Sequence, residues 1–197
     1  MTKQLPHDEY IAAVADALTA AGLHPADAFT DDSDTSGSHF YLRAVITLDD
    51  SSGIPATRWR HGLILIWEWH TGIEAADGEP ERGPSWEWAR LVDEHGQCGE
   101  REALTAIGYA SPAYVVESVR ALIERRNQST PAERWERADG LDAACEAWGI
   151  EETSERPEKC PECGATRFDF APNHCDGISQ GHAWLCTGCK WGQWLTA

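Results

Sequence analysis

Two pairs of closely spaced cysteines near the end of the chain constrain its fold more than any other feature. Two residues separate the cysteines within each pair and twenty-two separate the pairs: Cys160, Cys163, Cys186 and Cys189. This spacing is close to that of Cys₄ zinc sites, in which each pair forms a tight turn whose N–H groups point at the sulfurs. Gly164, directly after Cys163, suits the left-handed backbone that such a turn often requires. We therefore predict one metal site in roughly the last forty residues.

Short strands should accompany the two turns. Residues 167–170 alternate as a strand does, residues 183–185 lead into the second pair, and residues 191–195 lead away from it. The whole pattern resembles the zinc ribbon family over about residues 156–197. The resemblance implies that the four cysteines are the ligands of one Zn²⁺, and it implies no other role. Lys190 stands where many ribbons have a glycine, which weakens assignment to a particular subfamily.

The expected zinc ion is structural. Four thiolates fill a tetrahedral site and leave no open position for water or substrate. So small a module buries little apolar surface, and metal binding commonly supplies its folding free energy, about 10–16 kcal/mol in zinc-finger peptides. A redox dithiol is the competing interpretation of any C-x-x-C pair. Three nearby residues either form a second metal site, replace one ligand, or are ordinary loop positions: His174, Cys175 and His182.

The remaining cysteines and the N-terminus indicate the compartment. Seven cysteines is an odd number, and the chain starts without the basic-then-apolar pattern of an export signal. Metal binding is therefore favoured over disulfides, and Cys98 and Cys145 are expected to be ordinary thiols. No apolar run reaches the roughly eighteen residues of a membrane span. We expect a soluble cytoplasmic protein, and its arginine-rich, lysine-poor composition is compatible with a bacterial or phage source.

The charge is strongly acidic and unevenly distributed. The formal net charge is −17, and residues 156–197 hold four basic and four acidic side chains, so the whole excess belongs to residues 1–155. Such a surface disfavours binding to duplex DNA, which depends on phosphate neutralisation. The acidic segment at 31–34 and the turn at 80–84 are expected to be solvated. Alternatively, they belong to an acidic surface that imitates nucleic acid and occupies a basic site on another protein.

The hydrophobic pattern of residues 1–150 predicts an α+β domain with an antiparallel sheet and packed helices. Strands are predicted at 40–48, 59–70 and 85–92, with loops at 26–39 and 71–84. Helices are predicted at 8–21, 112–126 and 131–148, the last two from Ser-Pro and Thr-Pro start signals, with Glu133 completing a capping box and Gly140 as a position for a break. A linker at 151–158 and a Cys₄ zinc ribbon at 159–197 complete the chain.

Two Trp-Glu-Trp segments occur in the predicted sheet. Trp67 and Trp69 share one strand face, as do Trp86 and Trp88, so pairing of these strands would gather four rings. Such a cluster forms either an aromatic core or a ligand groove. Nearby acids and histidines belong to no recognised catalytic motif, so we predict no catalytic residue among them: Glu68, Glu87, His61, His70 and His95.

The leading hypothesis is a non-enzymatic accessory or regulatory protein that binds zinc and contacts another protein through its ribbon, its acidic surface or both. Five residues form the candidate contact surface of the ribbon: Trp184, Trp191, Trp194, Arg167 and Lys190. The same residues suit an alternative in which the tryptophans stack on single-stranded nucleic acid. A third alternative is an enzyme with an unrecognised site on the Trp-rich sheet.

Overall fold

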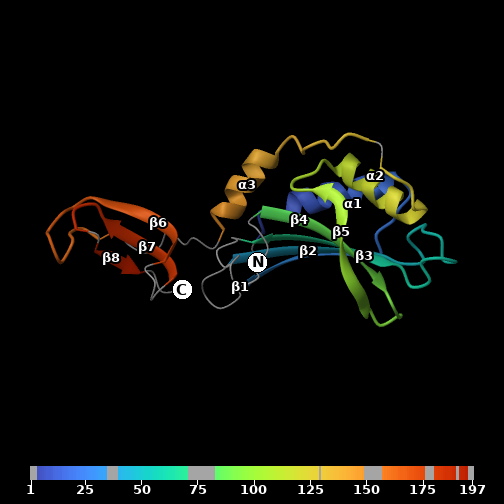
Figure 1. Cartoon of the computed structure of the whole chain (residues 1–197), viewed down its shortest axis with the longest axis horizontal. Helices are drawn as coiled ribbons and strands as arrows, with labels where there is room; N and C mark the ends of the chain where they lie inside the picture. Colours follow the sequence, from blue (N-terminus) through green and yellow to red (C-terminus); the bar gives the residue numbers. More distant parts are fainter. Residues whose placement is uncertain are drawn as a thin grey trace. The chain divides into compact units, whose positions relative to one another are not determined.

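A computed structural model describes residues 4–34, 40–70, 83–128, 130–148, 157–175, 180–189 and 191–194. The chain divides into two compact units, one made of Met1–Ser33 with Tyr41–Glu146 and one that contains Ala147–Ala197. The first has a five-stranded antiparallel sheet and three helices, and the second has a three-stranded antiparallel sheet (Figure 1). This confirms the predicted α+β class. Most of the predicted linker, residues 151–156, lies outside the described residues.

The sheet of the first unit has the strand order β1-β2-β3-β4-β5. Its bounds are Asp27–Asp34, Phe40–Leu48, Leu63–His70, Gly83–Leu91 and Cys98–Ile107. Strands β2 and β4 agree with the prediction, and β3 has the expected central position but begins four residues late. The chain enters β3 at Gly62, which has φ +97° and where a Cβ would collide with the carbonyl oxygen of Leu48. This turn excludes residues 59–62 from the strand.

The two outer strands were not predicted. Strand β1 lies in the segment expected to be a loop, and β5 lies where no element was expected. The loop prediction is therefore wrong over residues 27–34, and β5 was missed. An outer strand pairs with only one neighbour and tolerates a polar sequence, so its sequence need not show the alternation of a buried strand. In β1 an acidic side chain contributes to pairing, since Asp31 forms an ion pair with Arg43 of β2 at 2.6 Å.

The three helices are α1 (Asp8–Ala20), α2 (Pro112–Glu124) and α3 (Ala138–Glu146). The first two match the prediction, and Ser111 Oγ accepts the N–H of Tyr114 as the expected N-cap of α2. The third prediction was wrong over residues 131–137. Glu133 does not form a capping box, because its backbone oxygen accepts the N–H of Ser111 and its carboxylate accepts the Ser111 hydroxyl. Gly140 lies within α3 and does not break it.

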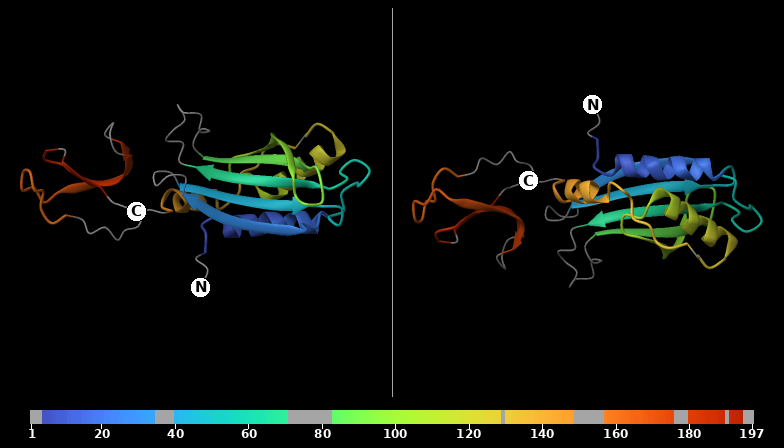
Figure 2. Two further views of the ribbon diagram at one scale, coloured as in Figure 1. Left: turned by 90° about the horizontal axis from the view of Figure 1, so that it is seen from below. Right: turned by 90° about the horizontal axis from the view of Figure 1, so that it is seen from above.

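All three helices lie on one face of the five-stranded sheet (Figures 1 and 2). Among the described residues, none of the helices combines the length and apolarity needed to cross a membrane. The helix-covered face holds the core, and its centre is aromatic. Trp67 and Trp86 are direct cross-strand partners, and Tyr10 of α1 lies edge-on to both rings at 6.1 and 6.2 Å. The indole N–H of Trp86 donates to Tyr10 Oη, which donates to the carbonyl of Ala110.

The Trp-Glu-Trp segments therefore contribute chiefly to the interior. Trp67, Trp69 and Trp86 are each 2% exposed or less, and only Trp88 is partly exposed. The common-face prediction agrees with the register, which places Trp67 opposite Trp86. Large aromatic rings that are buried in this way stabilise the fold through removal of apolar surface from water and through edge-to-face contacts. This arrangement favours the aromatic-core interpretation over a groove lined by all four rings.

The second unit has strands β6 (Phe168–Cys175), β7 (Gln180–Cys186) and β8 (Gly192–Trp194), with β7 in the centre. The three strands occur where short strands were predicted, but β6 and β7 are longer. The buried centre consists of Cys160, Phe168 and Cys186, against which Ala165, Trp184 and Trp191 pack. A core this small makes the cysteines a large part of the interior of the unit.

Candidate metal centre

The four paired cysteines come together at one end of the small sheet. Cys160 and Cys163 precede β6, Cys186 ends β7, and Cys189 lies in the turn before β8. Their Sγ atoms all lie within 4.8 Å of one another. Sγ of Cys160 is 3.4 Å from that of Cys189, and Sγ of Cys163 is 3.5 Å from that of Cys186. A tetrahedron with Zn–S bonds of about 2.3 Å has S–S edges of about 3.8 Å, so the cluster fits such an ion.

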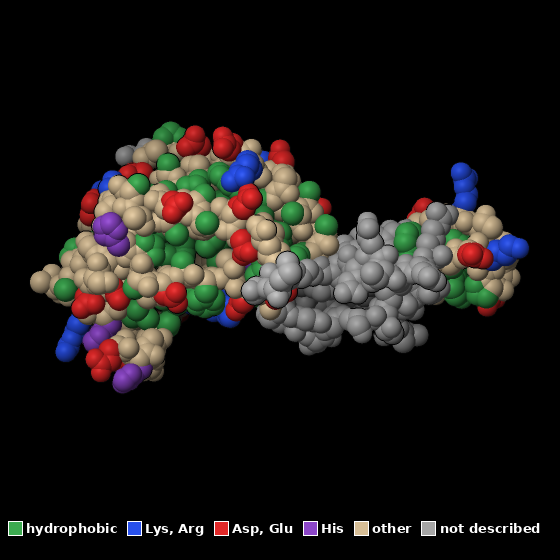
Figure 3. All heavy atoms as spheres, turned by 180° about the vertical axis from the view of Figure 1, so that it is seen from behind, with side chains coloured by type: hydrophobic (Ala, Val, Ile, Leu, Met, Phe, Trp, Pro, Cys, Tyr) green, Lys and Arg blue, Asp and Glu red, His purple; other side chains and the backbone are tan. Residues whose placement is uncertain are grey.

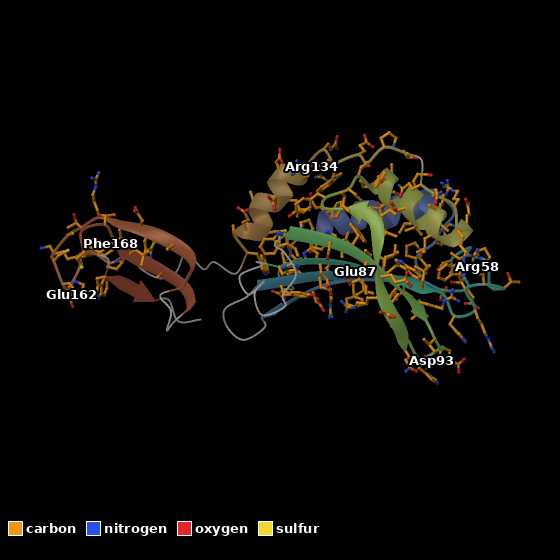
Figure 4. All side chains as sticks on the ribbon, viewed as in Figure 1. Arg58, Glu87, Asp93, Arg134, Glu162 and Phe168 are labelled. Carbon is orange, nitrogen blue, oxygen red and sulfur yellow. The ribbon has the colours of Figure 1, made fainter. Side chains whose placement is uncertain are left out.

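Backbone hydrogen bonds shape the first cysteine turn. The N–H of Gly164 donates to the carbonyl of Cys160, and the N–H of Cys160 donates to the carbonyl of Ala165, each at 2.8 Å. Gly164 has φ +71°, the left-handed conformation predicted for this position. Figure 4 shows Glu162 on this loop and Phe168 at the start of the strand that follows. These hydrogen bonds shape the turn that carries the sulfurs of Cys160 and Cys163.

The second turn is built in a related way. The N–H of Cys186 donates to the carbonyl of Trp191 at 2.7 Å, and the N–H of Gly188 donates to Sγ of Cys186 at 3.3 Å. The N–H of Thr187 donates to the carbonyl of Arg167, which ties the turn to the segment before β6. An N–H that points at a sulfur stabilises the thiolate form that binds a metal.

Gly188 is a functional position that the sequence analysis missed. A Cβ at this residue would lie 3.2 Å from Sγ of Cys163 and 3.4 Å from Cβ of Ala165. A side chain would therefore press on the opposite turn. The signal was present in the sequence as a glycine between the cysteines of the second pair, but its contact with the first pair depends on the fold.

The cysteine thiols influence one another electrostatically. Burial opposes ionisation of Cys186, but N–H donation from Gly188 and Cys189 outweighs it and lowers its pKa to about 7. The N–H of Trp191 favours the thiolate of Cys189, yet burial and the neighbouring thiols raise its pKa to about 12. Several thiolates this close repel one another. A bound divalent cation is the partner that would let all four ionise together.

The predicted contact surface in the second unit is only partly described. Trp184 and Trp191 are half-buried against the small core, with the Trp191 and Phe168 rings edge-to-face at 6.4 Å. Arg167 is exposed. Trp194 pairs with Ala183 through β8, but its side chain lies outside the described residues, as does Lys190 altogether. Partial burial leaves Trp184 and Trp191 some ring area for contact.

The predicted second metal site falls on three side chains outside the described part of the chain. The backbones of His174 and Cys175 pair with Gly181 and Gln180, and His182 lies in β7. Within the residues that the structure describes, the paired cysteines are the one group of three or more metal-ligating side chains. A role for His174, Cys175 and His182 therefore stays a prediction.

The acids and histidines of the large sheet do not converge on one site. Glu68 and Glu87 approach the same guanidinium, that of Arg101, at 2.9 and 3.6 Å. His95 is 82% exposed at the tip of the β4–β5 hairpin. His61 and His70 lie at opposite ends of β3. The arrangement brings two carboxylates together, but with an arginine between them.

Comparisons of this chain with models of protein families, with curated proteins and with solved structures gave no match. The function is therefore inferred from the side chains and their geometry. The strongest feature is the group of four sulfurs, because it joins two distant sequence segments at distances that suit a metal ion.

Proposed function

We propose that Cys160, Cys163, Cys186 and Cys189 bind one structural Zn²⁺ in a site of the zinc-ribbon type, in a non-enzymatic accessory or regulatory protein that contacts another protein. The observation that carries the zinc site is the approach of all four Sγ atoms to within 4.8 Å of one another. Zinc bound there would cross-link the two turns and supply folding free energy. Soft thiolate ligands in a tetrahedral set favour zinc, with iron as the chemical competitor.

The pairing of the sulfurs supports a metal site over a redox dithiol. The approaches at 3.4 and 3.5 Å join Cys160 to Cys189 and Cys163 to Cys186, so each joins one C-x-x-C pair to the other. A C-x-x-C redox centre works by forming a disulfide within one pair. A tetrahedral ion instead requires four sulfurs around one point, and the approach of all four Sγ atoms to within 4.8 Å of one another supports this arrangement.

Two features support a binding role rather than catalysis. Four thiolates would complete the coordination of the ion and leave no position for substrate, and the acids of the large sheet are tied to Arg101. Contact with a partner has two candidate surfaces. One is the ribbon around Trp184, Trp191 and Arg167, and the other is the acidic surface of the first unit, where acidic side chains are spread widely over the face in Figure 3.

Elemental analysis tests the zinc site. Full-length protein purified without chelators should hold one zinc and no iron per chain, and the Cys163→Ser, Cys186→Ser double variant should hold none. Cys98→Ser is the matched control, because Cys98 is an exposed thiol outside the cluster. Full zinc retention by the double variant, or a folded wild-type ribbon without metal, would overturn the assignment.

A binding titration tests the protein-binding role against the nucleic-acid alternative. Full-length protein is titrated with duplex and single-stranded DNA at several salt concentrations. We expect weak or no duplex binding at physiological salt, because the net charge is −17. Sub-micromolar duplex binding with a steep salt slope would contradict the proposal. Single-strand binding that Trp191→Ala abolishes would support the stacking alternative.

A further inference from the structure

The face of the five-stranded sheet opposite the helices carries a hollow of about 820 Å³. The described helices all lie on the other face (Figures 1 and 2). Five apolar side chains from four strands line the hollow: Phe29, Val45, Ile64, Ile66 and Leu91. The cross-strand register places Val45 opposite Ile66 and Thr47 opposite Ile64, which gives an apolar strip of three aliphatic side chains beside the hydroxyl-bearing Thr47. Phe29 on outer strand β1 is 43% exposed.

The β4–β5 hairpin forms one wall of this hollow. Two register irregularities interrupt the pairing of β4 with β5, and such bulges bend and twist a strand pair. In Figure 4 the end of the hairpin, marked by Asp93, lies on one side of the sheet and Arg134 lies on the other, with the helices. Asp93 accepts the N–H groups of His95 and Gln97, which fixes the turn.

The loop between β2 and β3 forms the wall at the end of those strands. Asp49 accepts the backbone N–H of Ser51 at 2.8 Å and its hydroxyl at 2.6 Å. These bonds lower the pKa of Asp49, the Ser51 hydroxyl contributing most, so the carboxylate stays charged at neutral pH. Local hydrogen bonds therefore shape both the β2–β3 loop and the end of the β4–β5 hairpin, which are the two walls of the hollow.

The charge around the apolar strip is acidic. Four carboxylates lie on the walls: Asp49, Asp50, Asp93 and Glu94. Two of the three lining arginines are neutralised from within the sheet. Arg43 donates two hydrogen bonds to Asp31, at 3.2 and 2.6 Å, and Arg101 pairs with Glu68 and Glu87. Arg60 is the third. The hollow therefore presents an apolar floor between acidic walls.

We infer that this face binds an amphipathic basic segment of a partner protein, an inference that rests on the proposed protein-binding role and names the chemistry of the partner. In an extended segment, alternate side chains point to opposite faces. Apolar residues of such a segment would cover Val45, Ile64 and Phe29, while neighbouring Lys or Arg residues reach the wall carboxylates. The net charge of −17 would draw a basic segment toward the protein and repel a second copy of this chain.

The test uses full-length, zinc-loaded protein and two capped hexapeptides of equal charge, one alternating Leu with Lys and the other alternating Ser with Lys. Binding is followed by methyl NMR and calorimetry. We expect the Leu–Lys peptide to shift the methyl signals of Val45, Ile64 and Ile66 and to bind at least tenfold more tightly than the Ser–Lys peptide. Ile107, which is 71% exposed and outside the hollow, should not shift.

Two substitutions in the hollow should each weaken Leu–Lys binding at least tenfold: Ile64→Gln and Phe29→Ser. Phe29 is already partly exposed on an outer strand, so Phe29→Ser should keep the fold. Ile107→Ser removes a more exposed apolar side chain outside the hollow and should change nothing. Equal binding of the two peptides, or unchanged binding by both hollow variants, would overturn the inference. A concentration-dependent dimer of the wild-type protein that is lost in Phe29→Ser would also overturn the inference, because the face would then bind a second copy of this chain.

The zinc site and the hollow can fail separately. The Cys163→Ser, Cys186→Ser variant should bind the Leu–Lys peptide like wild type, because every lining residue of the hollow belongs to the first unit. Zinc loading without peptide binding would reject the hollow and leave the zinc site standing. Peptide binding by a protein that never holds zinc would reject the zinc site alone.

Discussion

The two units of this chain reach a folded state with very different amounts of buried surface. The first buries apolar side chains from all three helices and from strands β2 to β5. The buried cluster of the second contains Cys160, Phe168 and Cys186, and two of these three residues are candidate metal ligands. Hydrophobic stabilisation grows with the apolar area removed from water. The first unit can therefore be held by its own core, whereas the second needs a cross-link.

The two units also differ in how close their candidate binding sites lie to their buried cores. In the small unit the buried centre and the candidate metal site share Cys160 and Cys186, so a change at either cysteine alters both the site and the core. In the large unit the aromatic core lies under the helices and the acidic hollow lies on the opposite face. Substitutions in the hollow can therefore alter binding while the core remains intact.

Removing the metal should give the largest effect and should act on one unit only. We expect a strong chelator to unfold residues 157–194, because zinc binding contributes about 10–16 kcal/mol in comparable small modules. Amide NMR signals of strands β6 to β8 should collapse to unfolded positions, while those of β2 to β4 remain. Readdition of zinc should restore them.

A truncated chain provides the control for this experiment. Residues 1–150 contain the whole aromatic core and seven of the ten tryptophans, and should show one cooperative thermal transition by themselves. If the truncated chain lacked that transition, or if chelation unfolded both units of the full-length protein, the contrast between a self-sufficient unit and a metal-dependent one would be wrong.

Truncating the central tryptophan should give the next largest effect. Trp67→Ala removes a fully buried ring that contacts Tyr10 and stacks with His7. We expect a loss of about 3–5 kcal/mol in the free energy of unfolding of the first unit, measured by urea denaturation. Trp88→Ala is the matched control, and should cost less because Trp88 is partly exposed. Neither variant should change the zinc content, and a loss of zinc in Trp67→Ala would show that the units are coupled.

The helices and strands that could be predicted from the sequence are those that bury one face, because burial of one face leaves a regular spacing of apolar residues. Helices α1 and α2 and strands β2 and β4 have apolar residues at helical or alternating spacing, and their predicted bounds were close. Strands β1 and β5 were missed because outer strands can be polar along much of their length, and β1 is largely acidic. The segment before α3 was predicted as helix because nothing local reveals that Glu133 bonds to Ser111, twenty-two residues away.

The residues of the candidate sites likewise fall into those that local sequence reveals and those that depend on long-range contacts. The four cysteines were identifiable because their spacing encodes the two turns, and Gly164 because it follows its cysteine directly. Gly188 was missed because its role is to make room for Cys163, which lies twenty-five residues earlier. The hollow was also missed, since it depends on the bend of a hairpin whose second strand was not predicted. Long-range contacts of this kind leave no local pattern.

Buried His7 should make the first unit sensitive to mild acid. Its side chain is fully buried, Nε2 lies 2.9 Å from the carbonyl oxygen of Arg43, and the ring stacks on Trp67. Burial is the main cause that lowers its pKa below the ordinary 6.5, against weaker opposing effects of the Arg43 carbonyl and of Asp8, Asp31 and Asp32. The unfolded state therefore takes up a proton at a higher pH than the folded state, and stability falls as the pH drops below about 6.5.

The measurement for His7 is the free energy of unfolding at pH 7 and pH 5 in wild type and His7→Phe. We expect wild type to lose more stability than the variant over this interval, by about 1.4 kcal/mol for each unit by which folding lowers the pKa of His7. His95→Phe is the control, because the His95 side chain is 82% exposed. Equal losses in wild type and His7→Phe would mean that carboxylates alone govern the acid response.

The smallest effect is expected from adding one methyl group between the two cysteine turns. In Gly188→Ala the new Cβ would lie 3.2 Å from Sγ of Cys163, so the opposite turn must move by a few tenths of an ångström to keep the four sulfurs around the ion. We expect zinc affinity to fall by less than about tenfold, or 1.4 kcal/mol, as measured by competition with a chromophoric chelator.

Gly164→Ala separates crowding at the sulfur from backbone strain. A Cβ at Gly164 meets nothing within 4 Å, but the residue has φ +71°, a conformation that costs an alanine roughly 1 kcal/mol. Gly188→Ala should therefore alter the spectrum of a cobalt-substituted site, because it displaces a ligand, whereas Gly164→Ala should weaken binding with the spectrum unchanged. Identical spectra in both variants would contradict this prediction, because they would mean that the backbone of the small unit shifts to accommodate the new methyl group and the metal geometry does not change.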